Sequence, residues 1–292
     1  MKLNDKVPFG NGKVKWVSTE WLNNNLDNDQ IQIIDCQPNV HDYIQEHIPN
    51  ARYMNENLLR IPEAGIPGKY ISEETFKLLA GRLGLNIDKP VVVYSGKGAF
   101  KGWGDGLEQT MIAYSLARFG QIEVFLLSGG LQKWKSENRI LTKKFSQIQS
   151  TIYPATIAED YFLTYEEFKE VKDNQDTILL DARPSEIYEG QGPWIKAGHI
   201  PGALNLPWKD LMTDENPTLR KSYDKISAIL DKMGISPDKM IICSCGTGRE
   251  ATNEFIMFKW LLNYPNVKIY EGSFTEWTAY EENPTVTGKS PR

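Results

Sequence analysis

One cysteine occupies a position where its thiolate could act as a nucleophile. In the segment MIICSCGTGREATNEF, residues 240–255, an apolar run leads to Cys245, a short Gly-Thr-Gly loop follows, and an amphipathic helical pattern begins near Arg249. Glycines let successive backbone N–H groups face one point, and a helix N-terminus adds partial positive charge there. Such a position can lower a cysteine pKa well below about 8.5, and Arg249 would contribute further. Cys245 is therefore the candidate nucleophile, and we expect its pKa to be lowered.

The same segment also permits a phosphatase interpretation. Counted from Cys243, it has a C-x5-R spacing that resembles the phosphate loop of cysteine phosphatases. In that interpretation Cys243 attacks phosphorus and Arg249 binds two phosphoryl oxygens. Against it, Ile242 stands where a histidine is usual, and Glu250 stands where a Ser or Thr is usual. Cys243 also lies inside the apolar run, which favours a role in core packing.

Composition limits the class of protein. The 292 residues, 40% of them hydrophobic, suit two globular domains. A net charge of −5 without a long basic tract excludes the electrostatic footprint of a nucleic-acid binder. Three cysteines and three histidines make neither a disulfide framework nor a zinc ligand set, so no metal and no cofactor is expected. No apolar run approaches a membrane span and the N-terminus lacks the apolar core of a signal peptide, so a cytoplasmic location is expected. A periplasmic location would follow if a signal peptide had been removed.

The chain contains two copies of one unit. Four blocks recur in the same order at offsets of roughly 150 residues. They pair Asp35 with Asp181, His47 with His199, Ser95 with Cys245, and Trp134 with Trp277. Chance matches would not keep both order and spacing. We therefore predict two homologous domains, residues 1–143 and 161–292, joined by a polar linker at 144–160 that contains Pro154.

Each unit alternates short apolar runs with longer amphipathic stretches. Continuous apolar runs fit strands that are buried on both faces, as in a parallel sheet. The predicted strands are 14–17, 31–34, 91–94 and 123–127 in the first unit, and 177–181, 203–206, 240–244 and 267–270 in the second. Segments 72–85 and 223–235 are predicted helices that end near glycine. The expected fold class is α/β, with two tandem domains that each have a parallel sheet and helices on both faces.

The first unit lacks the candidate nucleophile. Ser95 takes the place of the cysteine, and no adjacent base is visible in the sequence to activate its hydroxyl. Its glycine-rich loop, SGKGAFKGWGDG at 95–106, lacks the Gly-Lys-Ser/Thr ending of a phosphate-binding P-loop. The histidines and aspartates that recur in both units are expected to be structural, because the unit without the cysteine has them too.

Four blocks of the second unit resemble the tandem form of the rhodanese-type sulfurtransferases. They are DAR at 181–183, AGHIPGALNLPW at 197–208, the Cys245 loop, and EGSFTEW at 271–277, and the resemblance extends over residues 14–288. It implies an inactive first domain and an active second domain. The loop cysteine would take a sulfane sulfur from a donor, become a persulfide, and pass the sulfur to cyanide or to a thiol, including a protein thiol. The resemblance assigns the nucleophile to Cys245 and the persulfide cradle to the backbone of Gly246, Thr247, Gly248, Arg249 and Glu250.

The donor depends on charges around the loop. In the family that the chain resembles, basic loop residues accompany thiosulfate and glycine-rich loops accompany 3-mercaptopyruvate, and this loop mixes the two. Arg249 suits an anionic sulfonate or carboxylate, so thiosulfate is the expected donor. Ile187 replaces a second anion-binding arginine of the family, which leaves Arg183 as a further substrate-binding candidate, or as half of a structural ion pair. Glu250 would either repel an anionic donor or pair with Arg249. A pair of binding modules without catalysis remains the other alternative.

Overall fold

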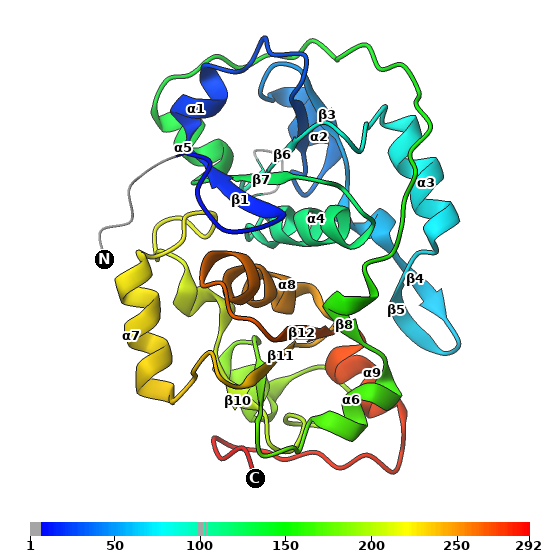
Figure 1. Cartoon of the computed structure of the whole chain (residues 1–292), viewed down its shortest axis with the longest axis vertical. Helices are drawn as coiled ribbons and strands as arrows, with labels where there is room; N and C mark the ends of the chain where they lie inside the picture. The colour runs from blue at the N-terminus through cyan, green and yellow to red at the C-terminus, as the bar shows by residue number, and fades with distance from the viewer. Residues whose placement is uncertain (1–6, 99–101, 103) are drawn as a thin grey trace.

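The computed structural model describes residues 7–98, 102 and 104–292, and these contain two five-stranded parallel sheets (Figure 1). The first sheet has the order β1-β7-β6-β2-β3 and the second has the order β10-β9-β11-β12-β8. Read from β8, the second sheet places its strands in the same relative order as the first. The duplicated α/β architecture that the sequence predicts is therefore confirmed. The boundaries at residues 143 and 161 stay predictions.

The elements of the first sheet and its helices precede residue 137. The strands are β1 Val14–Val17, β2 Gln32–Asp35, β3 Ala51–Tyr53, β6 Val91–Tyr94 and β7 Val124–Leu127, with an added antiparallel hairpin of β4 Arg60–Glu63 and β5 Ile66–Tyr70. The helices are α1 Thr19–Asn23, α2 Val40–Gln45, α3 Glu73–Arg82, α4 Leu107–Arg118 and α5 Gly130–Ser136, with a 3-10 turn η1 at Glu56–Leu59.

The second half repeats this series. Its strands are β8 Phe162–Leu163, β9 Thr177–Asp181, β10 Leu204–Asn205, β11 Met240–Ser244 and β12 Val267–Tyr270. Its helices are α6 Tyr165–Val171, α7 Tyr223–Met233, α8 Arg249–Ile256 and α9 Ser273–Ala279, with single turns η2 Glu159–Tyr161, η3 Ile187–Gln191, η4 Trp208–Leu211 and η5 Met257–Leu261.

The predicted elements lie close to their expected places. The helix predicted at 223–235 begins after the N-cap Ser222, whose side chain accepts the Lys225 N–H, and ends at Gly234 in the left-handed conformation. Strands 14–17, 91–94, 177–181, 240–244 and 267–270 match their predicted bounds. Strands β3 and β8, with three and two residues, are too short to carry a periodic signal and were not predicted. The β4–β5 hairpin was not predicted either.

Helices α4 and α8 pack against each other between the two sheets (Figure 1). All twelve side chains of α4 are buried, although the helix carries Glu108 and Arg118. The Tyr114 ring of α4 meets the Phe255 ring of α8 edge to face, with the centroids 5.1 Å apart. The apolar core is continuous across this contact, so the first domain covers the helix that follows the Cys245 loop.

The predicted linker lies along the first domain. The Thr151 N–H donates to the Gly81 carbonyl over 2.9 Å, and the buried Tyr153 donates its hydroxyl to Gln121. Backbone hydrogen bonds hold this segment in an extended path, although it has no helix or strand before the turn η2. Among the described residues no helix has both the length and the apolar character needed to cross a membrane.

Glu254, on the inner face of α8, is predicted to destabilise the folded chain at alkaline pH. Its side chain is fully buried, and neither carboxyl oxygen has a hydrogen-bond partner among the described residues. Burial raises its pKa well above the usual range, so the folded chain keeps a proton that the unfolded chain releases above about pH 4.3. Glu254→Met should therefore raise the free energy of unfolding by about 1–3 kcal/mol at pH 8 and by less at pH 5.

Urea unfolding of both proteins at the two pH values measures this difference. Glu74→Met, at an exposed position of α3, serves as the control and should change stability little. An equal gain at pH 5 and pH 8 would show that Glu254 is ionised in the folded chain.

Candidate active site

The Cys245 loop connects β11 to α8 at the carboxyl end of the second sheet. The Cys245 side chain is fully buried, and the Gly248 N–H donates to its Sγ over 3.0 Å. Gly248 has a φ of +85°, and a Cβ there would lie 2.5 Å from the Glu271 carbonyl oxygen. Only glycine fits this turn, and it is the turn that directs the N–H toward the sulfur.

The pKa of the Cys245 thiol is shifted upward, whereas the sequence predicts a lowered pKa. Burial raises this pKa well above its ordinary value, and the negative charge of Glu250 raises it further. The expected lowering of the Cys245 pKa is therefore wrong. The Gly-Thr-Gly loop after Cys245 predicts that N–H groups face the sulfur. It carries no information about how deeply the thiol is buried or where the Glu250 carboxylate lies.

Arg249 is bound by carboxylates of the first domain. Its Nε donates to both oxygens of Glu56 over 2.8 and 2.9 Å. Its Nη1 and Nη2 donate to Asp105 over 2.6 and 2.9 Å, and Nη2 lies 3.5 Å from Glu108. The Arg249 charge is therefore compensated from across the domain interface. These contacts replace the pairing with Glu250, which was one of the two roles predicted for that carboxylate. This arrangement does not support the predicted donor-binding role of Arg249.

Arg183 lies inside the second domain. Only 1% of this residue is exposed, its Nε and Nη2 donate to Asp181, and Nη2 also donates to the Gly198 carbonyl. The guanidinium packs over the Phe274 ring, with 4.3 Å to the centroid. Of the two predicted roles, this geometry fits the structural ion pair. The Trp194 ring covers both Arg183 and Gly246, and a Cβ on Gly246 would lie 2.4 Å from it.

Cys243 lies within β11 and faces the apolar core. Its side chain is fully buried, and burial together with the nearby Glu254 raises the pKa of its thiol. The phosphatase interpretation needs Cys243 in contact with a phosphate that Arg249 binds. Cys243 is enclosed and Arg249 is already paired, so the structure does not favour it.

The counterpart of the site in the first domain has a serine next to a carboxylate. The buried Ser95 hydroxyl donates to Glu108 over 2.9 Å, so the expectation that no base adjoins it is wrong. Burial, together with the charge of Asp105, raises the pKa of Glu108 to about 7. Residues 99–101 and 103 of the glycine-rich loop lie outside the described residues. His47 and His199 are buried, and each ring contacts two backbone carbonyls, as expected for structural residues.

A cavity of about 240 Å³ adjoins the Cys245 loop and is shared by both domains. The β4–β5 hairpin region forms one wall, and the loop and the start of α9 form the other. Arg60 donates through Nη1 to the Thr247 carbonyl and places a cation at this cavity. The lining residues are Asn57, Arg60, Ile66, Pro67, Gly68, Thr247, Gly272 and Thr275. Among the described residues no cluster of His, Cys, Asp and Glu could hold a metal ion.

The sequence did not identify the residues that the first domain adds to the site. Glu56, Arg60 and Asp105 precede Cys245 by more than a hundred residues, and no motif connects them with it. Ser273 was also missed, although its hydroxyl accepts the Cys245 N–H over 3.1 Å. Its signal was present in the sequence, since it lies in the EGSFTEW block of the predicted signature.

These features define a duplicated α/β protein with one cysteine site, in which the cysteine ends a strand and faces a backbone N–H. Residues 18–137 and 164–280 match the family described as the rhodanese-like domain. The chain therefore belongs to the rhodanese family, and it is a sulfurtransferase.

Individual relatives agree with this assignment over most of their length. The 3-mercaptopyruvate sulfurtransferase of Escherichia coli is 29% identical over 285 residues, which cover 92% of this chain and 96% of the relative. The thiosulfate sulfurtransferase of Azotobacter vinelandii is 30% identical over 249 residues, with 83% and 86% covered. The solved structure of SseA from Escherichia coli, described as a 3-mercaptopyruvate sulfotransferase, has a TM-score of 0.78 at 29% identity and covers 89% of this chain and 98% of that chain.

Removal of the Arg249 guanidinium should destabilise the chain in a pH-dependent way. Arg249→Ala leaves Glu56, Asp105 and Glu108 facing one another without the cation that pairs with all three, which should lower the free energy of unfolding by about 2–3 kcal/mol at pH 8. The pKa of Glu56 is already raised and that of Glu108 is about 7, and loss of the cation raises both further. At pH 6 protonation relieves the repulsion, so the loss should be smaller.

Urea unfolding at pH 6 and pH 8 measures the two losses. Arg292→Ala, which removes an exposed partner of Asp173, is the control and should have little effect at either pH. A loss of the same size at both pH values would mean that the three carboxylates do not act as a coupled group.

Proposed function

We propose that Cys245 carries sulfur as a persulfide. Its Sγ attacks the outer sulfur of the donor, the bond between that sulfur and the rest of the donor breaks, and the electron pair leaves with the remaining fragment. An acceptor thiol or cyanide then attacks the outer persulfide sulfur, and the Cys245 thiolate leaves. The Gly248 N–H, 3.0 Å from Sγ, is the observation that carries this proposal. The cradle is the backbone from Gly246 to Glu250.

The thiol proton has an acceptor within the same loop. Burial keeps the Cys245 pKa high, so the proton must leave as the sulfur attacks. The Glu250 carboxylate acts on this thiol and raises its pKa, and in this proposal it takes the proton. A carboxylate beside the nucleophile, unexpected from the family pattern, then has a function as the base that activates a buried thiol.

The charges around the cavity favour a donor with a single negative charge. The expectation of thiosulfate rested on Arg249, and Glu56 and Asp105 already compensate that cation. Among the described residues that line the cavity, Arg60 is then the cation beside the loop. One arginine can pair with the single carboxylate of a donor such as 3-mercaptopyruvate, whereas the thiosulfate dianion needs a second cation. We therefore propose a 3-mercaptopyruvate-like donor, with thiosulfate as the second candidate.

The persulfide should form on Cys245 alone. Incubation with donor should add about 32 Da to the intact protein, and peptide mapping should place the sulfur on Cys245, because Cys243 is enclosed by the core. Cys245→Ser should lose both the adduct and turnover, since a hydroxyl does not replace a thiol here. Cys243→Ala should keep turnover and lose about 1 kcal/mol of stability. An adduct on Cys243 with hydrolysis of an aryl phosphate would favour the phosphatase alternative, and no adduct with any donor would favour a binding module.

Donor choice should depend on Arg60. We expect kcat/KM to be higher for 3-mercaptopyruvate than for thiosulfate, with cyanide as the acceptor. Arg60→Met should lower kcat/KM for 3-mercaptopyruvate by about 10- to 150-fold, the loss of one charge-assisted contact of roughly 1.5–3 kcal/mol. Arg82→Met, at an exposed position of α3, is the control and should leave it unchanged. A preference for thiosulfate that Arg60→Met leaves intact would contradict this assignment.

A further inference from the structure

Trp194 lies on a segment that the second domain adds to the repeat. In both domains a tyrosine stacks on a later histidine, Tyr43 on His47 with the ring centroids 3.9 Å apart and Tyr188 on His199 with 3.6 Å. The first tyrosine comes 4 residues before its histidine and the second comes 11 before, so the second domain has seven more residues between the two rings. The domain that has the cysteine therefore carries an additional segment, and Trp194 is part of it.

The Trp194 indole covers one side of the Cys245 loop. Its Nε1 donates to the Thr275 hydroxyl over 2.7 Å, and that hydroxyl donates to the Gly246 carbonyl over 2.8 Å. The ring meets Phe274 edge to face, with the centroids 5.6 Å apart. A Cβ on Gly246 would collide with the indole, so the ring touches the residue that directly follows the nucleophile.

The sulfur of Cys245 is closed off while the indole has this position. The Cys245 side chain is fully buried, and the loop contributes Thr247 to the lining of the cavity of about 240 Å³. A sulfur donor reacts only when it touches the Cys245 Sγ, so part of the cover has to move before the reaction. The part that moves then decides how large a molecule can reach the sulfur.

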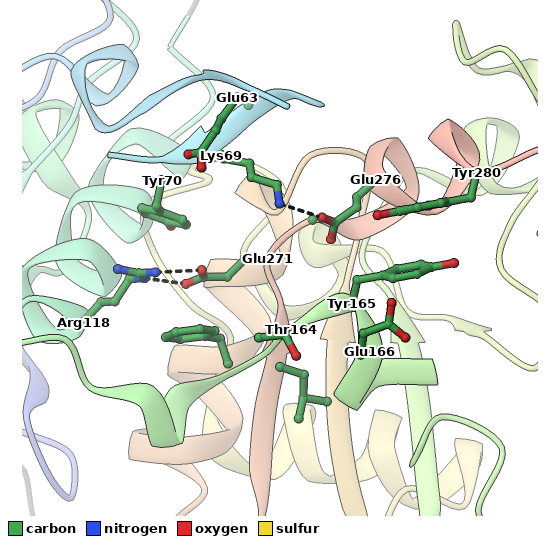
Figure 2. A pocket seen from close by; sticks show the side chains of 14 residues that line it. Glu63, Lys69, Tyr70, Arg118, Thr164, Tyr165, Glu166, Glu271, Glu276 and Tyr280 are labelled. Atoms are coloured by element: carbon green, nitrogen blue, oxygen red, sulfur yellow. Dashed lines mark hydrogen bonds and ion pairs between the residues drawn. The ribbon is translucent and has the colours of Figure 1, made fainter. Parts of the chain in front are cut away.

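The wall that α9 forms is held by the first domain. Figure 2 shows that Glu276 of α9 pairs with Lys69 of the β4–β5 hairpin, over 3.1 Å. Glu271, two residues before α9, accepts two N–H groups of Arg118 over 2.7 and 3.1 Å (Figure 2). Movement of this wall would separate two ion pairs across the domain interface, which is costly where the charges are shielded from water.

The Trp194 side chain is free to rotate at a lower cost. Residues 192–197, all of them described, lie outside any helix or strand, and Ile195 is 88% exposed. The indole is half-buried and has a single polar group, so one hydrogen bond breaks when the ring leaves. Lys196 keeps the segment attached by donating through Nζ to three backbone carbonyls, those of Tyr280, Glu281 and Asn283. The indole can therefore turn outward while the segment stays in place.

We propose that Trp194 is the gate of the sulfur site and that it determines the size of the molecules that reach Cys245. The indole closes the Gly246 side of the loop, and its outward rotation opens a path to the sulfur. A small nucleophile such as cyanide needs a narrow opening, whereas a bulky thiol such as glutathione needs the indole fully displaced. The choice of acceptor rests on the proposed function of Cys245, but control of access to the thiol does not.

Two reagents of the same chemistry and different size test the gate. Iodoacetamide and its fluorescein derivative both alkylate thiolates, so a change in the Cys245 pKa affects both rates equally and cancels in their ratio. A gate that is open about 1–10% of the time slows a reagent that needs full opening by about 10- to 100-fold. Trp194→Ala should therefore raise the rate of the fluorescein reagent at Cys245, relative to that of iodoacetamide, by at least about 10-fold. Trp194→Phe keeps a ring without the N–H donor and should give a smaller rise.

Trp21→Ala is the matched control, since Trp21 is also half-buried and also meets a phenylalanine edge to face, Phe125 at 5.3 Å, in the first domain. It should leave the ratio of the two rates at Cys245 unchanged. Peptide mapping adds an internal control, because Cys243 lies in the core and reacts only when the domain unfolds. An unchanged ratio in both Trp194 variants would overturn the proposal. Equal gains at Cys243 and Cys245 would also overturn it, because they would assign Trp194 a purely structural role.

Turnover gives a second readout of the gate. With a donor that loads Cys245, Trp194→Ala should raise kcat/KM for glutathione relative to cyanide by about 10-fold, because only the larger acceptor needs the indole fully displaced. An unchanged ratio of the two acceptors would overturn the role of Trp194 in acceptor choice. If the wild-type chain took sulfur from no donor, the proposed function would fail, while the two alkylation rates would still test the gate.

Discussion

The partly buried ion pairs between the first domain and the two segments around Cys245 are the constraint on which the site depends. Acidic residues of the first domain hold Arg249 at the start of α8, and Arg118 holds Glu271 just before the turn at Ser273. Charges removed from water in this way are stable only when every partner is in place. The two pairs have opposite polarity, so each domain supplies both a cation and a carboxylate to the other. The relative position of the domains therefore also sets the position of the cysteine loop.

This arrangement gives the domain without a cysteine a physical role. It covers α8 with apolar side chains such as Tyr114, supplies Arg60 to the cavity beside the loop, and fixes the turns on both sides of the sulfur. Its own pseudo-site is closed by the Ser95–Glu108 hydrogen bond, and Glu108 also faces Arg249. Residues of the domain without the cysteine thus contact the site of the other copy.

The sulfur combines a high resting pKa with a surrounding that is suited to an anion. Burial and Glu250 favour the neutral thiol, whereas the Gly248 N–H and the nearby Ser273 hydroxyl would stabilise negative charge once it forms. Hydrogen-bond donors that already face the sulfur need no reorganisation when the negative charge appears.

The sequence by itself determined the duplication, the parallel α/β class, most strands, and Cys245 at a strand-to-helix turn. These follow from local patterns, namely continuous apolar runs, helix-ending glycines and repeated blocks, which depend on few distant contacts. The tertiary structure decided what the charged groups near the cysteine do. Arg249 binds carboxylates of the other domain instead of remaining free for a donor, and Glu250 faces the thiol and raises its pKa. Partners more than a hundred residues away, and the burial that sets a pKa, exist only after two domains have packed, because both depend on desolvation and distance rather than on neighbours in the chain.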